Sequence, residues 1–200
     1  MNPKKKLVKN IFYISLILFT FLIIGCFGSP TTPGYKIQDQ IDPYYCIWNL
    51  WVTYNQYKVT GMIDQYKNIL SSDDYIFYFD PLDIGKDNGH GYIIPDSWDY
   101  NQDWQATQNM FNGAYSISFT IANLGYNGDE KDKDSFYNTY QPNWKNNNTE
   151  CDISGVQINL LLYVDQIHGY QAIGPCDFSF KLCDDSKWRM TVWRDKTSPQ

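Results

Sequence analysis

The sequence predicts an α+β domain in which helices come first and most strands follow. Apolar residues in the N-terminal half recur at helical spacing, as at Ile47, Leu50, Trp51 and Tyr54. Further along, apolar and polar residues alternate, as they do in half-buried strands. Aromatic residues make up 18% of the chain, a content typical of β-rich domains that bury large rings.

Two helices and one strand are expected first. Asp42 followed by Pro43 is typical of an N-cap with proline in the first turn, so a helix is predicted over about 43–58. The same apolar period predicts a second, shorter helix over 62–70. The β-forming run 75–80 then predicts a strand buried on both faces.

A third helix and four strands complete the predicted order ααβαββββ. Residues 81–102, rich in Asp, Gly, Asn and Pro, are expected to form a long loop, and 103–111 a helix capped by Asn101. The polar stretch 125–150 is expected to be a mobile insertion between strands. The predicted strands are 114–123, 156–166, 177–183 and 187–194.

The first residues have the pattern of an export signal. Four lysines at positions 4, 5, 6 and 9 precede an apolar run from Ile11 to Ile24, which is short for a membrane-spanning helix. The run ends in Gly25 and Cys26, and this ending resembles the lipobox of bacterial lipoproteins. The resemblance implies that Cys26 carries a diacylglyceryl lipid with acyl chains such as palmitate.

These features divide the chain into a signal peptide over 1–25, a lipidated cysteine with a flexible tether over 26–40, and one domain over 41–200. We therefore expect an exported protein held on the cell membrane by its lipid. Phe27 stands where an aspartate favours inner-membrane retention, so the outer membrane, facing the periplasm, is expected in a bacterium with two membranes.

Charge argues against a nucleic-acid partner. Removal of the four leader lysines leaves 12 of the 16 basic residues against 22 acidic ones, a net charge near −10. An acidic surface without a basic stripe is repelled by phosphates.

Ordered motifs resemble one branch of a known superfamily. Stretches within 48–80, 94–111 and 188–195 are similar to SnoaL-like lipoproteins of the nuclear transport factor 2-like superfamily, and the resemblance covers about 43–195. It implies a curved, mostly antiparallel sheet wrapped around three helices, a cone with a pocket at its open end. Members include isomerases, dehydratases, epoxide hydrolases and non-catalytic binding proteins, so the fold does not select a function.

Enzymes of this superfamily use carboxylates or a histidine deep in the cone. Asp80, at the end of the first predicted strand, is the candidate general base, with Tyr78 or Tyr100 as hydrogen-bond donor. Its position before Pro81 favours a turn-forming role instead. His90 and His168 lie in glycine-containing turns without an adjacent partner, so neither is expected to be catalytic.

Six aromatic side chains are candidates to line the cone and hold a small apolar ligand, although the same residues could fill its core. They are Tyr54, Tyr78, Trp98, Tyr100, Trp104 and Phe119.

Four cysteines besides Cys26 leave the disulfide state open. An even number in an exported chain allows one bond, two or none, and three pairings of the four exist. Cys151 and Cys183 flank a predicted hairpin, which makes them the favoured pair.

No cofactor or metal is expected, because the sequence has neither a calcium-loop spacing nor a zinc, nucleotide or dinucleotide motif. The sequence therefore favours a lipid-anchored, non-catalytic module that binds a small ligand or a protein. A cone-pocket lyase or isomerase with Asp80 as base is the alternative. A structural role with dimerisation through the sheet is the third interpretation.

Overall fold

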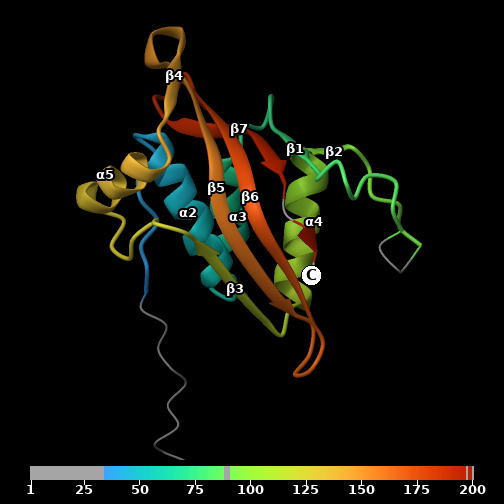
Figure 1. Ribbon diagram of the computed structural model, residues 1–200. Helices are drawn as coiled ribbons and strands as arrows, with labels where there is room; N and C mark the ends of the chain where they lie inside the picture. The colour runs from blue at the N-terminus through green and yellow to red at the C-terminus, as the bar shows by residue number, and fades with distance from the viewer. Residues whose placement is uncertain (1–33, 88–90, 197, 200) are drawn as a thin grey trace, which may run out of the picture. The chain divides into compact units, whose positions relative to one another are not determined.

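One curved sheet and the helices beside it make up the fold (Figure 1), and the computed structural model describes residues 34–87, 91–196 and 198–199. The predicted signal peptide, Cys26 and most of the tether lie outside these residues. The helices are α2 (Pro43–Asn55), α3 (Met62–Ile69), α4 (Tyr100–Gly113) and α5 (Glu130–Thr139), with a 3-10 turn at Asn146–Asn148. No helix in the described ranges is long and apolar enough to cross a membrane.

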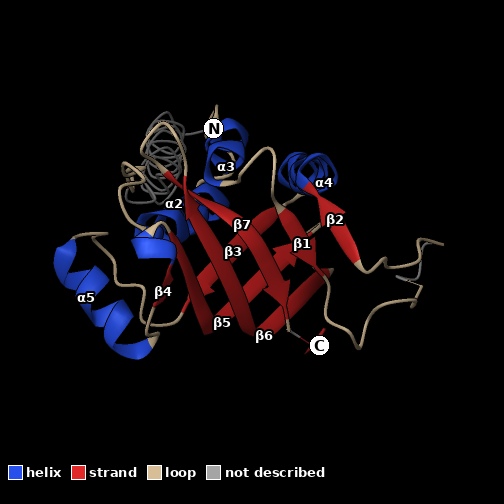
Figure 2. Ribbon diagram, turned by 90° about the horizontal axis from the view of Figure 1, so that it is seen from above, coloured by secondary structure: helices blue, strands red, loops and turns tan. Residues whose placement is uncertain are grey.

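The strands form a single sheet in the order β2-β1-β7-β6-β5-β3, while β4 pairs with β5 and β8 with β6. All neighbours are antiparallel except β1 and β7. Figure 2 shows α2, α3 and α4 on one side of the curved sheet and α5 beyond its β4 end. The predicted fold class is confirmed. The strands are β1 (Ile76–Tyr78), β2 (Ser97–Asp99), β3 (Ser116–Ile121), β4 (Asn143–Lys145), β5 (Glu150–Tyr163), β6 (Gly169–Leu182), β7 (Trp188–Asp195) and β8 (Ser198–Pro199).

Helix α2 lies at the centre of the core. The Asp42 carboxylate accepts a hydrogen bond of 2.9 Å from the backbone N–H of Tyr44, and Pro43 occupies the first turn, so the predicted N-cap is confirmed. Every residue from Pro43 to Tyr54 is buried. The helix has no solvated face because both the sheet and the segment before it pack against it.

That segment, residues 35–40, was assigned to the tether by sequence, and it packs on α2. Trp48 donates its indole N–H to the carbonyl oxygen of Lys36 at 3.0 Å, and Asn49 exchanges two hydrogen bonds of 2.8 Å with the backbone of Gln38. The packed unit accordingly begins at Tyr35.

Helix α4 begins earlier than predicted, and β2 lies within the predicted loop. Asp99, not Asn101, is the N-cap: its carboxylate accepts from the backbone N–H of Gln102, whose side chain accepts from the backbone N–H of Asp99. Asn101 accepts instead from the indole of Trp104. The prediction of Asn101 was wrong because the pattern gave no sign that Tyr100 belongs to the helix.

Helix α5 lies within the predicted mobile insertion, which is another difference from the sequence-based prediction. Its buried anchor is Phe136, fully enclosed and 5.6 Å from the ring of Tyr44. Apart from Tyr137, which packs against the core, the other helical residues are polar and most are exposed, so hydrophobic periodicity could not predict this helix.

Strands β5 and β6 form a long hairpin that bends at a β-bulge. Ile153 pairs with Phe178 and Val156 with Cys176, so β5 has one extra residue at Ser154 and Gly155. Gly155 has a φ of +71°, a conformation that favours glycine, and its N–H donates to Asp177 at 2.9 Å. Buried side chains change from odd positions before the bulge to even positions after it.

All four described cysteines are free thiols, so the favoured Cys151–Cys183 disulfide is not formed. Cys151 pairs across the hairpin with Phe180, three residues before Cys183. Because side chains alternate along a strand, an odd offset directs Cys183 toward the face opposite to that of Cys151.

Candidate functional site: a pocket inside the cone

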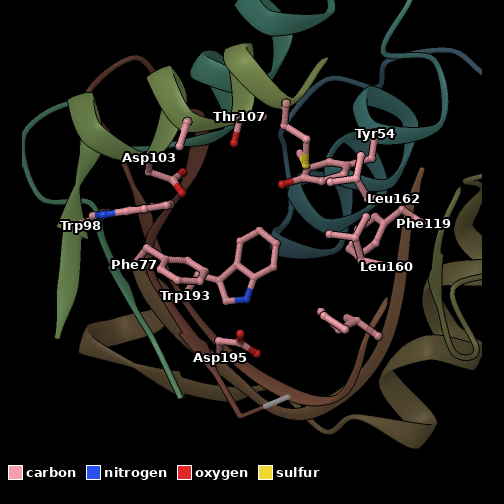
Figure 3. A pocket seen from close by; sticks show the side chains of 14 residues that line it. Tyr54, Phe77, Trp98, Asp103, Thr107, Phe119, Leu160, Leu162, Trp193 and Asp195 are labelled. Carbon is pink, nitrogen blue, oxygen red and sulfur yellow. The ribbon is translucent and has the colours of Figure 1, made fainter. Parts of the chain in front are cut away.

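A pocket of about 310 Å³ lies between the helices and the concave side of the sheet (Figure 3). Helix α4 contributes Asp103, Ala106, Thr107 and Met110 from one face, and β5 contributes Ile158, Leu160 and Leu162 at alternate positions. The remaining lining residues come from α2, β1, β2, β3, β6 and β7: Tyr54, Phe77, Trp98, Phe119, Ala172, Trp193 and Asp195.

Asp103 is the most deeply buried charged group of this pocket. Its side chain is only 5% exposed, and its Oδ2 accepts a hydrogen bond of 2.5 Å from the hydroxyl of Tyr66. Burial raises the pKa of Asp103 to about 6, and the hydrogen bond from Tyr66 opposes that rise. Among the described residues, no Lys, Arg or His forms an ion pair with Asp103.

Three buried tyrosines surround this carboxylate. Burial raises the pKa of Tyr54, Tyr66 and Tyr75, so all three hydroxyls keep their protons at neutral pH. The Tyr75 hydroxyl makes no hydrogen bond of ordinary geometry with the described residues, yet its proximity lowers the pKa of Asp103. The cluster therefore places protonated hydroxyl groups around a carboxyl whose pKa is raised to about 6.

An aromatic wall continues from Asp103 toward the other end of the pocket. The ring of Phe77 lies 6.0 Å from that of Trp98 and 5.5 Å from that of Trp193, between centroids. The buried indole N–H of Trp193 has no acceptor in hydrogen-bond geometry within the described ranges. Figure 3 shows these rings on one side of the cavity and Leu160 and Leu162 on the other.

Asp195 contributes the second carboxylate, at the end of β7. It is partly exposed, and its Oδ1 lies 3.8 Å from the thiol of Cys176 on the neighbouring strand. Figure 3 shows Asp195 at the opposite end of the cavity from Asp103, with the Trp193 ring between them.

Three of the six aromatic candidates line this pocket: Tyr54, Trp98 and Phe119. Tyr78 does not, because its neighbour Phe77 takes the inward position on β1 and the guanidinium of Arg194 covers the Tyr78 ring at 4.8 Å. Trp104 does not line it either, since the ammonium of Lys67 lies 3.7 Å from its ring centroid. Tyr100 lines a separate, polar surface groove.

Asp80 is buried but is not part of the pocket lining. Its Oδ1 accepts a hydrogen bond of 2.7 Å from the backbone N–H of Leu82, the geometry of a turn-forming aspartate. The carboxylate is therefore satisfied by its own turn.

The histidines are not pocket residues. His90 falls outside the described residues. His168 lies in the β5–β6 turn, where its Nδ1 is 2.7 Å from a carboxylate oxygen of Asp165, so an adjacent partner exists that the sequence did not reveal. The pair is exposed to solvent. Within 34–87, 91–196 and 198–199, no three His, Cys, Asp or Glu side chains are grouped to hold a metal ion.

The sequence-based prediction missed Asp103, because its candidate base, Asp80, lies at the end of a strand and Asp103 lies within a helix. The sequence does contain a signal for it: Asp103 is four residues before Thr107 and seven before Met110, so it shares the apolar stripe of the predicted helix. A carboxylate on an apolar stripe indicates either burial or a wrong helix boundary.

No family model matches the chain, and no curated protein matches it in sequence. Solved structures similar to it include a conserved protein from Planctomyces limnophilus, with a TM-score of 0.52 and 6% identity over 78% of this chain and 92% of that one. A nuclear transport factor 2-like protein from Salmonella enterica has a TM-score of 0.48 and 8% identity, covering 76% and 84% of the two chains. A hexachlorocyclohexane dehydrochlorinase from Novosphingobium barchaimii has values of 0.47 and 7%, covering 78% and 85%. At such identities the similarity concerns the fold alone.

Proposed function

We propose that the protein is an exported lipoprotein, anchored through Cys26, whose cone binds a small and largely apolar molecule without transforming it. The observation that carries the proposal is the pocket itself. Its volume of about 310 Å³ is at the small end of the range for ligand sites, and its walls are mainly aromatic and aliphatic.

The polar groups of the pocket support binding more than turnover. One oxygen of Asp103 already accepts from Tyr66, and none of the lining residues is a histidine. A pocket of apolar walls with a few fixed polar groups orients a ligand through one or two hydrogen bonds. The chain thus has the parts of a binding site, whereas proton transfer normally needs a second group that returns the proton.

A second candidate function rests on the pKa of Asp103. A carboxylate that titrates near pH 6 inside an apolar cavity has the property of a general acid or base. A lyase or isomerase of this cone would therefore use Asp103, and not Asp80, as the base.

Ligand extraction tests the binding proposal. The full chain is produced with its leader in a bacterium and purified in mild detergent, and organic extracts are analysed by mass spectrometry. Leu160→Trp fills the cavity and should remove the bound molecule. Leu161→Trp is the matched control, because Leu161 occupies the alternate position on β5 and does not line the pocket.

The same small molecule recovered equally from wild type, Leu160→Trp and Leu161→Trp would contradict the proposal. Catalytic consumption of a substrate that is lost in Asp103→Asn, while the variant still folds and binds, would instead establish the second candidate function.

Mass spectrometry of the mature N-terminus tests the anchor. We expect a chain that starts at Cys26 with the mass of an attached lipid, and loss of both processing and lipid in Cys26→Ser. An intact Met1 or an unmodified Cys26 would overturn this part. Light scattering of the purified chain tests the separate prediction of a homodimer.

A further inference from the structure

The charged groups that line the pocket are all negative. Asp103 and Asp195 approach it from α4 and β7, and the other twelve of its fourteen lining residues include no Lys, Arg or His. Asp103 is buried, with an exposed fraction of 5%. A carboxylate removed from water is costly when it has no positive partner, so the cavity is electrostatically suited to a cation.

The wall between the two carboxylates is aromatic. Phe77, Trp98 and Trp193 form a contiguous group of rings, and Figure 3 shows them between Asp103 and Asp195. The faces of aromatic rings attract cations, most strongly where water is excluded, and such walls recognise ammonium groups in particular.

The opposite wall excludes a bare or strongly hydrated ion. Ile158, Leu160 and Leu162 offer only aliphatic surface there, and Met110 adds apolar lining from α4. A ligand that fills the pocket must cover this surface with its own apolar groups. A volume of about 310 Å³ restricts the ligand to a small molecule.

We propose that the pocket binds a small organic cation: a protonated or quaternary amine with an apolar body. The inference rests on the proposed ligand-binding function and specifies the chemical class of its ligand. The ammonium group lies against the aromatic wall, within the field of Asp103 and Asp195, and the apolar body lies against Leu160 and Leu162.

The test compares two probes of equal shape. Calorimetry with the full chain in a non-ionic detergent measures the affinity for benzyltrimethylammonium and for neopentylbenzene, its uncharged isostere. Heats of partition into detergent are measured without protein and subtracted. We expect the cation to bind at least about tenfold more tightly than the hydrocarbon.

The variant Asp103→Asn tests how much the negative charge of Asp103 contributes to cation binding. Asparagine keeps the size of the side chain and an oxygen that can accept from Tyr66, so the affinity for neopentylbenzene reports any change other than the loss of charge in this variant. Its affinity for benzyltrimethylammonium should fall by about tenfold. Asp134→Asn, on the exposed side of α5, makes the same change in net charge outside the pocket and should leave both affinities unchanged.

Equal affinity for the two probes, or a cation affinity that Asp103→Asn does not alter, would overturn the inference of a cationic ligand while leaving the binding function intact. If neither probe binds, the cationic inference fails, and the binding function is then decided by ligand extraction with Leu160→Trp. The two proposals can therefore fail separately.

Discussion

The hydroxyl of Tyr66 in α3 donates a hydrogen bond of 2.5 Å to Asp103 in α4, and this contact joins two helices through the interior of the cone. Tyr66 is 0% exposed and Asp103 is 5% exposed. Burial raises the pKa of the Asp103 carboxyl, and the hydrogen bond from Tyr66 opposes that rise, so this tyrosine favours the ionised form.

Removal of that donor should raise the pKa of Asp103 further. Tyr66→Phe keeps the ring but leaves Asp103 with one hydrogen bond fewer, so we expect a pKa above about 6 and a loss of about 1–3 kcal/mol of stability. Carbon-13 titration of the Asp103 carboxyl and urea unfolding measure the two quantities. Tyr126→Phe, at a hydroxyl that is largely exposed, is the control and should change neither. An unchanged titration in Tyr66→Phe would show that the hydrogen bond does not act on Asp103.

The raised pKa of Asp103 should make the fold less stable as pH increases from about 4 to about 6. The folded state holds this proton up to about pH 6, whereas the unfolded chain releases it near 3.8, so the folded state binds more protons in that window. The contribution of Asp103 to the free energy of unfolding is greatest below pH 3.8. It decreases by about 3 kcal/mol as the pH rises past 6.

Other carboxylates act in the opposite direction, because the hydrogen bond from Arg189 lowers the pKa of Asp185 to about 2. The contribution of Asp103 is therefore obtained as the difference in the free energy of unfolding between wild type and Asp103→Asn. Urea unfolding at several pH values measures this difference. We expect Asn to be the more stable variant above pH 6 and the difference to shrink toward pH 4. The nearby Tyr54, Tyr66 and Tyr75 do not titrate in this range, because burial raises the pKa of each. A difference independent of pH would contradict the raised pKa.

The capping box of α4 should stabilise the first turn of the helix, which holds Asp103 in the pocket. Asp99→Ala removes the side-chain acceptor for the N–H of Gln102, so we expect about 1 kcal/mol of destabilisation and faster amide exchange in the first turn of α4. Asp99→Ser should retain most of the stability. Asn101→Ala serves as the comparison, and an equal effect there would refute the assignment of Asp99 as the cap.

Phe136 should hold α5 on the domain. Phe136→Ala empties a fully buried site beneath this helix, so we expect a loss of up to about 3–5 kcal/mol, unless α5 detaches and limits the loss. Hydrogen exchange resolved along the chain distinguishes the two, because detachment exposes only the amides of α5. Asn138→Ala, at an exposed position on the same helix, should have little effect. Equal exchange in both variants would be inconsistent with a Phe136 anchor.

The elements that the sequence predicted well are those whose signal is local. The N-cap at Asp42 and the apolar spacing from Ile47 to Tyr54 belong to α2 itself, so the helix could be predicted without knowledge of its neighbours. Helix α5 could not, because the contacts that hold it join Phe136 and Tyr137 to Asp42 and Tyr44, more than 90 residues earlier in the chain.

The pocket was predicted only in part for the same reason. Whether Phe77 or Tyr78 faces inward is decided by the pairing of β1 with β7, which brings Arg194 opposite Tyr78. The protonation of Asp103 depends on Tyr66, a residue 37 positions earlier on another helix. Residue spacing within a single element contains neither fact.

The extra residue of β5 determines which side chains of this strand line the pocket. Beyond Gly155 the inward positions are Ile158, Leu160 and Leu162, and a strand one residue shorter would shift the following side chains to the other face. Asn159, Leu161 and Tyr163 would then stand where Ile158, Leu160 and Leu162 line the pocket, so this wall would keep one aliphatic residue and gain an amide and a phenol. A single deletion at Gly155 would thus bring polar groups into an apolar wall without any substitution among the residues that line the pocket.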